Sequence, residues 1–102
     1  MHWRFWILWI LILSLPRIKG MDDMSVEVLF FARAREIAGK DTYYSEKLTL
    51  DSLVEELCMS FGPDMASILT ISRLWVNQDP AKEGQILRSG DRVAVLPPVS
   101  GG

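Results

Sequence analysis

The chain ends with Arg92-Val93-Ala94-Val95-Leu96-Pro97-Pro98-Val99-Ser100-Gly101-Gly102, an aliphatic run followed by prolines and glycines. The aliphatic part predicts a buried strand. Proline has no backbone N–H to donate to a sheet, so the two prolines are expected to end this strand and keep the chain extended. The two last glycines have no Cβ, so we expect a thin, flexible tip that can enter a narrow channel. This ending suggests a protein that presents its C-terminal carboxylate to another protein's active site.

The composition excludes most catalytic chemistries for this chain acting alone. Its 102 residues allow one domain with a small hydrophobic core. The formal net charge is −2 and the basic residues are scattered, which argues against a nucleic-acid partner. The single cysteine, Cys58, cannot form an internal disulfide, which fits a reducing compartment. The single histidine, His2, leaves no His/Cys metal cluster and no Ser-His-Asp or Cys-His catalysis.

Residues 1–23 form an extension unlike the rest of the chain. Residues 3–15 are almost wholly apolar and follow a short basic start, which is typical of a signal peptide. The stretch is shorter than the roughly 20 apolar residues that span a bilayer, and no A-x-A-like cleavage site follows it. Translation from Met21 or Met24 would remove it altogether. A start at one of these methionines, a signal or anchor, and an unknown role remain open, and we expect the fold to exclude this segment.

The first part of the body predicts two strands that pair around a short helical turn. Residues 25–32 alternate and then become continuously apolar, which predicts a central strand, half-exposed where it begins and buried where it ends. Residues 33–38 predict a short helical turn that Gly39 ends. Residues 41–48 are rich in strand formers and mostly polar, so we expect an edge strand that pairs with the first.

The clearest element is a helix over residues 49–61. Thr49 is placed to cap its first turn. Glu55 and Glu56 fall beside the apolar stripe and are expected in solvent, whereas Cys58 lies on the stripe and is expected to be a buried structural thiol. The stripe follows the helical spacing i, i+3, i+4, i+7, i+8 and i+11, with the residues Leu50, Leu53, Val54, Leu57, Cys58 and Phe61.

The remaining pattern completes a mixed sheet. Residues 64–69 predict a further short turn of helix, residues 73–78 a strand, and Asp79-Pro80 the start of a turn. The predicted order is strand, strand, helix, strand, strand. The first and last strands are the most apolar, so we expect them to lie adjacent at the centre, where they could run parallel.

This arrangement predicts an α+β fold of the β-grasp, or ubiquitin-like, type. One main helix would pack across a face of the mixed sheet, and a C-terminal Gly-Gly tail would project from the body. The expected boundaries are an extension over residues 1–23, a domain over 24–96 and a flexible tail over 97–102.

Three motifs resemble the small, sulfur-carrier subunit of molybdopterin synthase. They are Phe30-Phe31-Ala32-Arg33-Ala34-Arg35-Glu36 followed by Gly39, the turn Gly90-Asp91, and the ending Val93-Ala94-Val95-Leu96-Pro97-Pro98-Val99-Ser100-Gly101-Gly102. The resemblance covers about Val26 to Gly102, and residues 1–20 have no counterpart in the family pattern.

The resemblance implies a role for Gly102 as a protein-borne substrate. A carboxylate is ionised and must be activated, so an E1-like enzyme uses ATP to adenylate Gly102, and sulfur then replaces the adenylate to give a thiocarboxylate. The tail next enters the large catalytic subunit of a heterotetramer of two small and two large subunits, where sulfur passes to cyclic pyranopterin monophosphate. The implied chain is a cytosolic, non-catalytic subunit with no bound cofactor or metal and no membrane partner. The implied channel residues are Pro97, Pro98, Val99, Ser100 and Gly101.

Other functions are compatible with the same features. A sulfur carrier for thiamine synthesis or for tRNA thiolation would also end in Gly-Gly. A ubiquitin-like modifier conjugated to lysines, or a plain interaction module, would use the same fold without sulfur. A persulfide carrier would use Cys58, which the helical stripe instead predicts to be buried.

Overall fold

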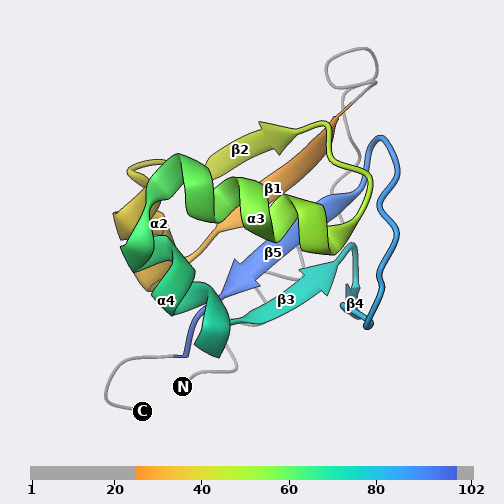
Figure 1. Cartoon of the computed structure of the whole chain (residues 1–102). Coiled ribbons are helices and arrows are strands. Elements are labelled where there is room, and N and C mark those ends of the chain that lie inside the picture. The colour runs from red at the N-terminus through yellow and green to blue at the C-terminus, as the bar shows by residue number, and fades with distance from the viewer. Residues whose placement is uncertain (1–24, 99–102) are drawn as a thin grey trace.

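Residues 25–98 are described by the computed structural model, and within them a five-stranded mixed sheet carries the helices (Figure 1). The sheet order is β2-β1-β5-β3-β4. The strands are β1 (Val26–Phe30), β2 (Thr42–Ser45), β3 (Arg73–Val76), β4 (Asp79–Pro80) and β5 (Arg92–Leu96). The helices are α2 (Ala32–Ala38), α3 (Leu50–Phe61) and α4 (Pro63–Ile71).

The first and last strands form the centre of the sheet, as the sequence predicted. β1 and β5 run parallel, with Glu27 opposite Arg92 and Phe30 opposite Val95. β2 pairs antiparallel with β1, and β3 pairs antiparallel with β5. A parallel pair needs a long crossover, and the helices and outer strands between β1 and β5 supply it. The predicted β-grasp topology is therefore confirmed.

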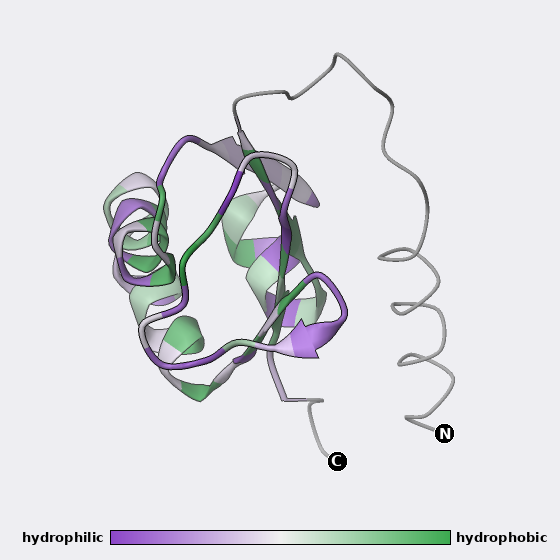
Figure 2. Ribbon diagram, turned by 90° about the vertical axis from the view of Figure 1, so that its right-hand side faces the viewer, coloured by the Kyte–Doolittle hydropathy of each residue, from purple (hydrophilic) through white to green (hydrophobic). Residues whose placement is uncertain are grey.

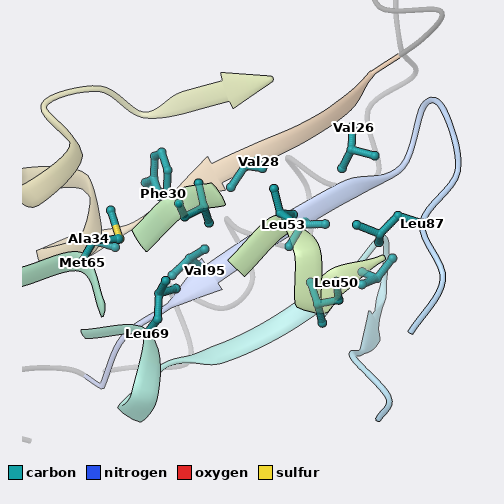
Figure 3. Packing of buried hydrophobic residues seen from close by; sticks show 13 residues of the cluster. Val26, Val28, Phe30, Ala34, Leu50, Leu53, Met65, Leu69, Leu87 and Val95 are labelled. Carbon is teal, nitrogen blue, oxygen red and sulfur yellow. The ribbon is translucent and has the colours of Figure 1, made fainter. Parts of the chain in front are cut away.

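The helices all contribute their buried residues to one side of the sheet, which we call the inner face. Figure 2 shows α3 and α4 together on this side. Figure 3 shows the resulting core, in which side chains from β1 and β5 meet those of the helices. The cluster consists of Val26, Val28, Phe30, Ala34, Leu50, Leu53, Leu57, Met65, Leu69, Val76, Leu87, Val93 and Val95.

β1 departs from its predicted burial pattern. The strand alternates throughout: Val26, Val28 and Phe30 are buried, whereas Glu27 and Leu29 are half-buried on the opposite side. The prediction of continuous burial toward its end was wrong, because successive side chains of a strand point to opposite faces. We call the opposite side the outer face.

α3 forms where the apolar stripe and its cap predict. The Thr49 side chain accepts a hydrogen bond of 3.1 Å from the Ser52 backbone N–H, which satisfies one of the helix's unpaired donors. Leu53 and Leu57 on the stripe are buried, whereas Cys58 is only half-buried against the core. The thiol is thus a core-facing residue, but not the buried one that was predicted.

Glu56 does not lie free in solvent, as predicted. Its carboxylate accepts a hydrogen bond of 2.9 Å from the Tyr43 hydroxyl and another from the Ser45 hydroxyl. Both partners belong to β2, so the carboxylate ties α3 to the edge strand. Its neighbour Glu55 is exposed, as expected. Periodicity separates a helix's core face from its other faces, but it does not show which neighbouring element lies beside them.

The segment between α3 and the last strand is more regular than predicted. The short turn expected over residues 64–69 is a nine-residue helix, α4, which begins at Pro63 directly after Gly62. The turn expected at Asp79-Pro80 lies at Asn77 and Gln78 instead, with Asn77 in the left-handed region at φ 57°. Asp79 and Pro80 form the edge strand β4. Proline has no backbone N–H to donate, and at the edge of the sheet this removes no hydrogen bond between central strands.

Candidate functional site

The tail leaves the domain from the most constrained strand of the sheet. β5 is hydrogen-bonded on both sides, parallel to β1 and antiparallel to β3. Its last four residues, 93–96, are all buried. The strand ends at Leu96, as the following prolines predicted, and Pro97 is buried whereas Pro98 is exposed. The start of the tail is thus held by the sheet, and the chain reaches the surface at Pro98.

The part of the tail that was predicted to react lies outside the described residues. Val99, Ser100 and Gly101 were predicted as channel residues, and Gly102 as the residue that is activated. Their roles stay predictions. The structure does show where their path begins, at the end of a central strand (Figure 1).

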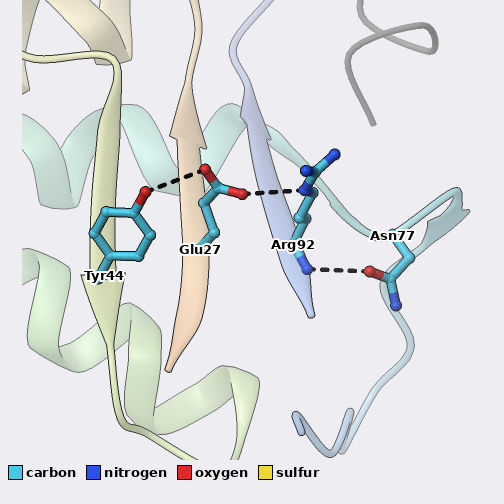
Figure 4. Close-up of polar contacts among 4 residues, drawn as sticks. All are labelled: Glu27, Tyr44, Asn77 and Arg92. Carbon is cyan, nitrogen blue, oxygen red and sulfur yellow. Dashed lines mark hydrogen bonds and ion pairs between the residues drawn. The ribbon is translucent and has the colours of Figure 1, made fainter. Parts of the chain in front are cut away.

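A row of polar side chains crosses the outer face at the opposite end of β5 (Figure 4). The Arg92 Nε lies 3.0 Å from Glu27 Oε1, across the central parallel pair. The Tyr44 hydroxyl donates a long hydrogen bond of 3.4 Å to Glu27 Oε2 from β2. Asn77 Oδ1 accepts a bond of 3.0 Å from the Arg92 backbone N–H. This polar row joins β2, β1, β5 and the β3–β4 turn.

The polar row could have been predicted from the strand register. Glu27 and Arg92 lie directly opposite each other, and opposite charges in such positions attract. The sequence analysis did not align the strands and therefore missed the pair. The side chains are only 17% and 13% exposed, so the pair lies in a less screened environment than a typical surface ion pair.

A second group of outer-face residues lies at the tail end of the sheet and is apolar. We call it the outer-face cluster. Ala94 and Leu96 are its buried members, and the partly buried members packed against them are Leu29, Phe31 and Trp75. Leu96 is also the last strand residue before the tail. The outer face beside the tail is therefore hydrophobic.

The short helix α2, before β2, carries most of another of the three motifs on which the resemblance rested. Ala34 is completely buried, whereas Arg33 and Arg35 are exposed. Gly39 ends the helix at φ 73°, and its N–H donates to the Arg35 carbonyl oxygen. Arg33 pairs with Glu36 at 3.1 Å, in an exposed position. The motif thus combines one packing residue with a solvated charged surface.

Residues 25–98 contain no group of three or more metal-ligating side chains. Within the same range, no helix has the length and hydrophobicity needed to cross a bilayer.

A ubiquitin-like β-grasp domain whose tail continues from its central strand is the class of protein that this fold and site define. More particularly, the chain belongs to the ThiS family, whose profile matches residues 28–102. A relative from Dictyostelium discoideum, named molybdopterin synthase sulfur carrier subunit, is 36% identical over 83 residues. The match covers 74% of this chain and 94% of that relative.

Solved structures share the fold. SAMP1 from Haloferax volcanii has a TM-score of 0.66 at 24% identity, with 76% of this chain and 99% of that chain covered. A chain in a complex of subunits 1 and 2 of molybdopterin-converting factor from Helicobacter pylori has a TM-score of 0.59 at 24% identity. Here 78% of this chain and 100% of that chain are covered. At these identities the likeness is one of fold.

Proposed function

We propose that this chain is the sulfur carrier subunit of a molybdopterin synthase. The observation that carries the proposal is the similarity to the Dictyostelium discoideum relative of that name. It is 36% identical to this chain, and the match covers 94% of its length. The family match supports it because it extends through the Gly-Gly end, to residue 102. The fold supports it because the tail continues directly from β5.

The proposed chemistry takes place on the carboxylate of Gly102. An ionised carboxylate is a poor electrophile, because its negative charge repels a nucleophile. An E1-like partner would join it to the AMP part of ATP, with release of pyrophosphate. Sulfur at the oxidation level of hydrosulfide would then attack the acyl carbon and displace AMP, which leaves a thiocarboxylate on Gly102. ATP is thus a substrate of the partner, and this chain would need no cofactor of its own.

The sulfur would next be delivered inside a large synthase subunit. The tail from Pro97 to Gly102 would enter that subunit's active site, where cyclic pyranopterin monophosphate accepts the sulfur. The residues that catalyse this step would belong to the large subunit, so this chain is non-catalytic. We propose an assembly of two small and two large subunits in the cytosol. The Helicobacter pylori chain that shares the fold occurs in a complex of subunits 1 and 2 of molybdopterin-converting factor, which supports a protein partner for this chain.

The fixed base of the tail would favour insertion. Binding costs more when a flexible segment must be ordered, and the two prolines restrict the first residues after the strand. Pro97 is already buried, so ordering would be limited to the residues after it. A side chain at 101 or 102 would widen the tip and obstruct a narrow channel.

Conjugation to lysines is the second candidate function. Its support is the fold likeness to SAMP1, and fold alone does not distinguish a modifier from a sulfur carrier. Carriers for thiamine synthesis or tRNA thiolation would share the thiocarboxylate but differ in the acceptor. The acceptor therefore has to be tested separately from sulfur loading.

Reconstitution with purified partners tests the proposal. The chain is incubated with an E1-like enzyme, ATP and a sulfur donor, and the C-terminal fragment is analysed by mass spectrometry. We expect one oxygen of Gly102 to be exchanged for sulfur, and the loaded chain to convert cyclic pyranopterin monophosphate when the large subunit is added. The Cys58→Ser variant should still transfer sulfur. Loss of transfer in a folded Cys58→Ser protein, or an unloaded Gly102, would contradict the proposal.

A further inference from the structure

Arginine side chains lie on both sides of the point where the tail leaves the domain. β5 runs between β1 and β3, and its last residue, Leu96, is opposite Arg73 of β3. On the other side, β1 leads into α2, whose exposed residues include Arg33 and Arg35. Figure 1 shows β5 pointing toward the end of the molecule at which α2 and the start of β3 lie. The base of the tail is thus flanked by cations from two elements.

Arg73 lies on the outer face of the sheet. Side chains two residues apart along a strand share a face, and Trp75 of the same strand packs against the outer-face cluster. Arg73 is exposed and lies directly across from Leu96, the last strand residue before the tail. It forms no ion pair with the other residues of the range 25–98. Its guanidinium group is therefore available to a protein that receives the tail.

Arg35 is available in the same way on the other side of the tail. Its neighbour Arg33 pairs with Glu36 at 3.1 Å, so this carboxylate is already engaged. Arg35 lines a shallow hollow with Glu36, Lys40 and Asp41, but it forms no salt bridge within the described part of the chain. The whole chain has a formal net charge of −2. An arginine without a salt bridge on each side of the tail is therefore a local departure from the acidic character of the chain.

We propose that Arg35 and Arg73, which we call the basic flank, bind carboxylates at the mouth of the active site in the E1-like partner that activates Gly102. The inference rests on the proposed function, because it requires a partner that takes up the tail. The guanidinium group is planar and donates paired N–H groups in a geometry that matches carboxylates. Opposite charges on the two sides of the tail would orient the chain before the tip enters the channel.

The activating partner suits this surface better than the large synthase subunit does. Exposed charges accelerate the encounter of two proteins more than they add to the affinity. The loading step needs rapid encounter and prompt release, because the loaded chain must leave to deliver its sulfur. A permanent assembly depends more on buried apolar contact, which exposed arginines do not provide. The basic flank is therefore expected to act on the rate of loading.

Loading kinetics of a charge-reversed variant test the proposal. The full chain with Arg35→Glu and Arg73→Glu is incubated with the E1-like enzyme, ATP and a sulfur donor, and the thiocarboxylate on Gly102 is measured by mass spectrometry. We expect kcat/KM to fall by about tenfold or more at low salt, because electrostatic steering is lost. At saturation kcat should be unchanged, because the basic flank does not touch the reacting atoms. The loss should shrink as the salt concentration rises from about 0.05 M to about 0.5 M.

The matched control makes the same change in charge at the other end of β5. Lys82 and Arg88 are exposed and line a hollow beside Asp91, which directly precedes β5. Lys82→Glu with Arg88→Glu should load at the rate of the unchanged chain, and both double variants should keep its circular dichroism spectrum. Equal loading of the two double variants would overturn the basic flank and leave the sulfur-carrier proposal intact. An unchanged chain that cannot be loaded would overturn both.

Sulfur delivery separates the two partners. The Arg35→Glu, Arg73→Glu chain, loaded at saturation, should deliver its sulfur to the large subunit at the rate of the unchanged chain. A comparable loss in this delivery, with loading unaffected, would overturn the assignment of the basic flank to the activating partner.

Discussion

The two faces of the sheet differ in what holds them together. On the inner face, β1 and β5 present only apolar side chains, and three helices bury them. On the outer face, the same two strands present the charged pair Glu27–Arg92 at one end and the outer-face cluster at the other. Burial of apolar area stabilises a domain in proportion to that area, whereas a single ion pair contributes little. The inner face should therefore determine whether the chain folds, and the outer face should determine what it contacts.

The largest effect is expected on the inner face. Leu57→Asp places a charge at a position that is 1% exposed, and burial of an unpaired charge should unfold the domain. Met59→Asp, on the same helix but 88% exposed, is the matched control and should remain folded. Circular dichroism and urea titration measure both. A stable Leu57→Asp protein would contradict the assignment of the helix face.

A smaller effect is expected where α3 meets β2. Glu56→Ala removes the acceptor of the Tyr43 and Ser45 hydroxyls, so we expect a loss of about 1–3 kcal/mol in the free energy of unfolding. Glu55→Ala, at the exposed neighbouring position, should change it by less than about 0.5 kcal/mol. Equal effects of the two variants in urea unfolding would show that the contact contributes nothing.

The polar row of the outer face should contribute less again. A double-mutant cycle on Glu27→Gln and Arg92→Met should give a coupling of about 1 kcal/mol, because both side chains are largely covered. The exposed pair Arg33–Glu36 is the comparison, with a coupling of no more than about 0.5 kcal/mol. A coupling at Glu27–Arg92 no larger than this would mean that the low exposure of the two side chains does not strengthen their attraction.

The smallest effect concerns pH. Burial raises the pKa of the Tyr43 hydroxyl above 10, the Glu56 carboxylate raises it further, and a bond to Ser60 lowers it in part. The folded state thus holds this proton more tightly than the unfolded state does. The associated stability is present below about pH 10 and is lost as the pH rises through the pKa of the folded state. Urea unfolding from about pH 8 to about pH 11 should show a shallower decline for Tyr43→Phe than for the unchanged chain; equal declines would contradict this.

The contrast between the faces also explains what could be predicted from sequence. Apolar periodicity predicted α3 and the central strands β1 and β5, because the spacing of their apolar residues reflects which side chains are buried. The prolines after Leu96 located the end of the last strand. Glu56 and the Glu27–Arg92 pair could not be found in this way, because their partners come from other elements. Their detection requires the sheet register.

The turn before β4 shows a second limit. Asp79-Pro80 has the composition of a turn, but the chain turns two residues earlier, at Asn77. Pairing of β4 with β3 decides between the two positions, and this pairing is a tertiary interaction. The tail residues from Val99 onward lie outside the described range. Their predicted roles therefore rest on the sequence resemblance and on chemical argument, and not on the structure.

The most direct test of the central claim is the intact mass of the protein isolated from its own cells, with fragmentation to locate any change. The account predicts a C-terminal fragment in which one oxygen of Gly102 is replaced by sulfur. A Gly102 that stays unmodified while the adenylating enzyme and sulfur donor are abundant would contradict the sulfur-carrier account and favour an interaction module.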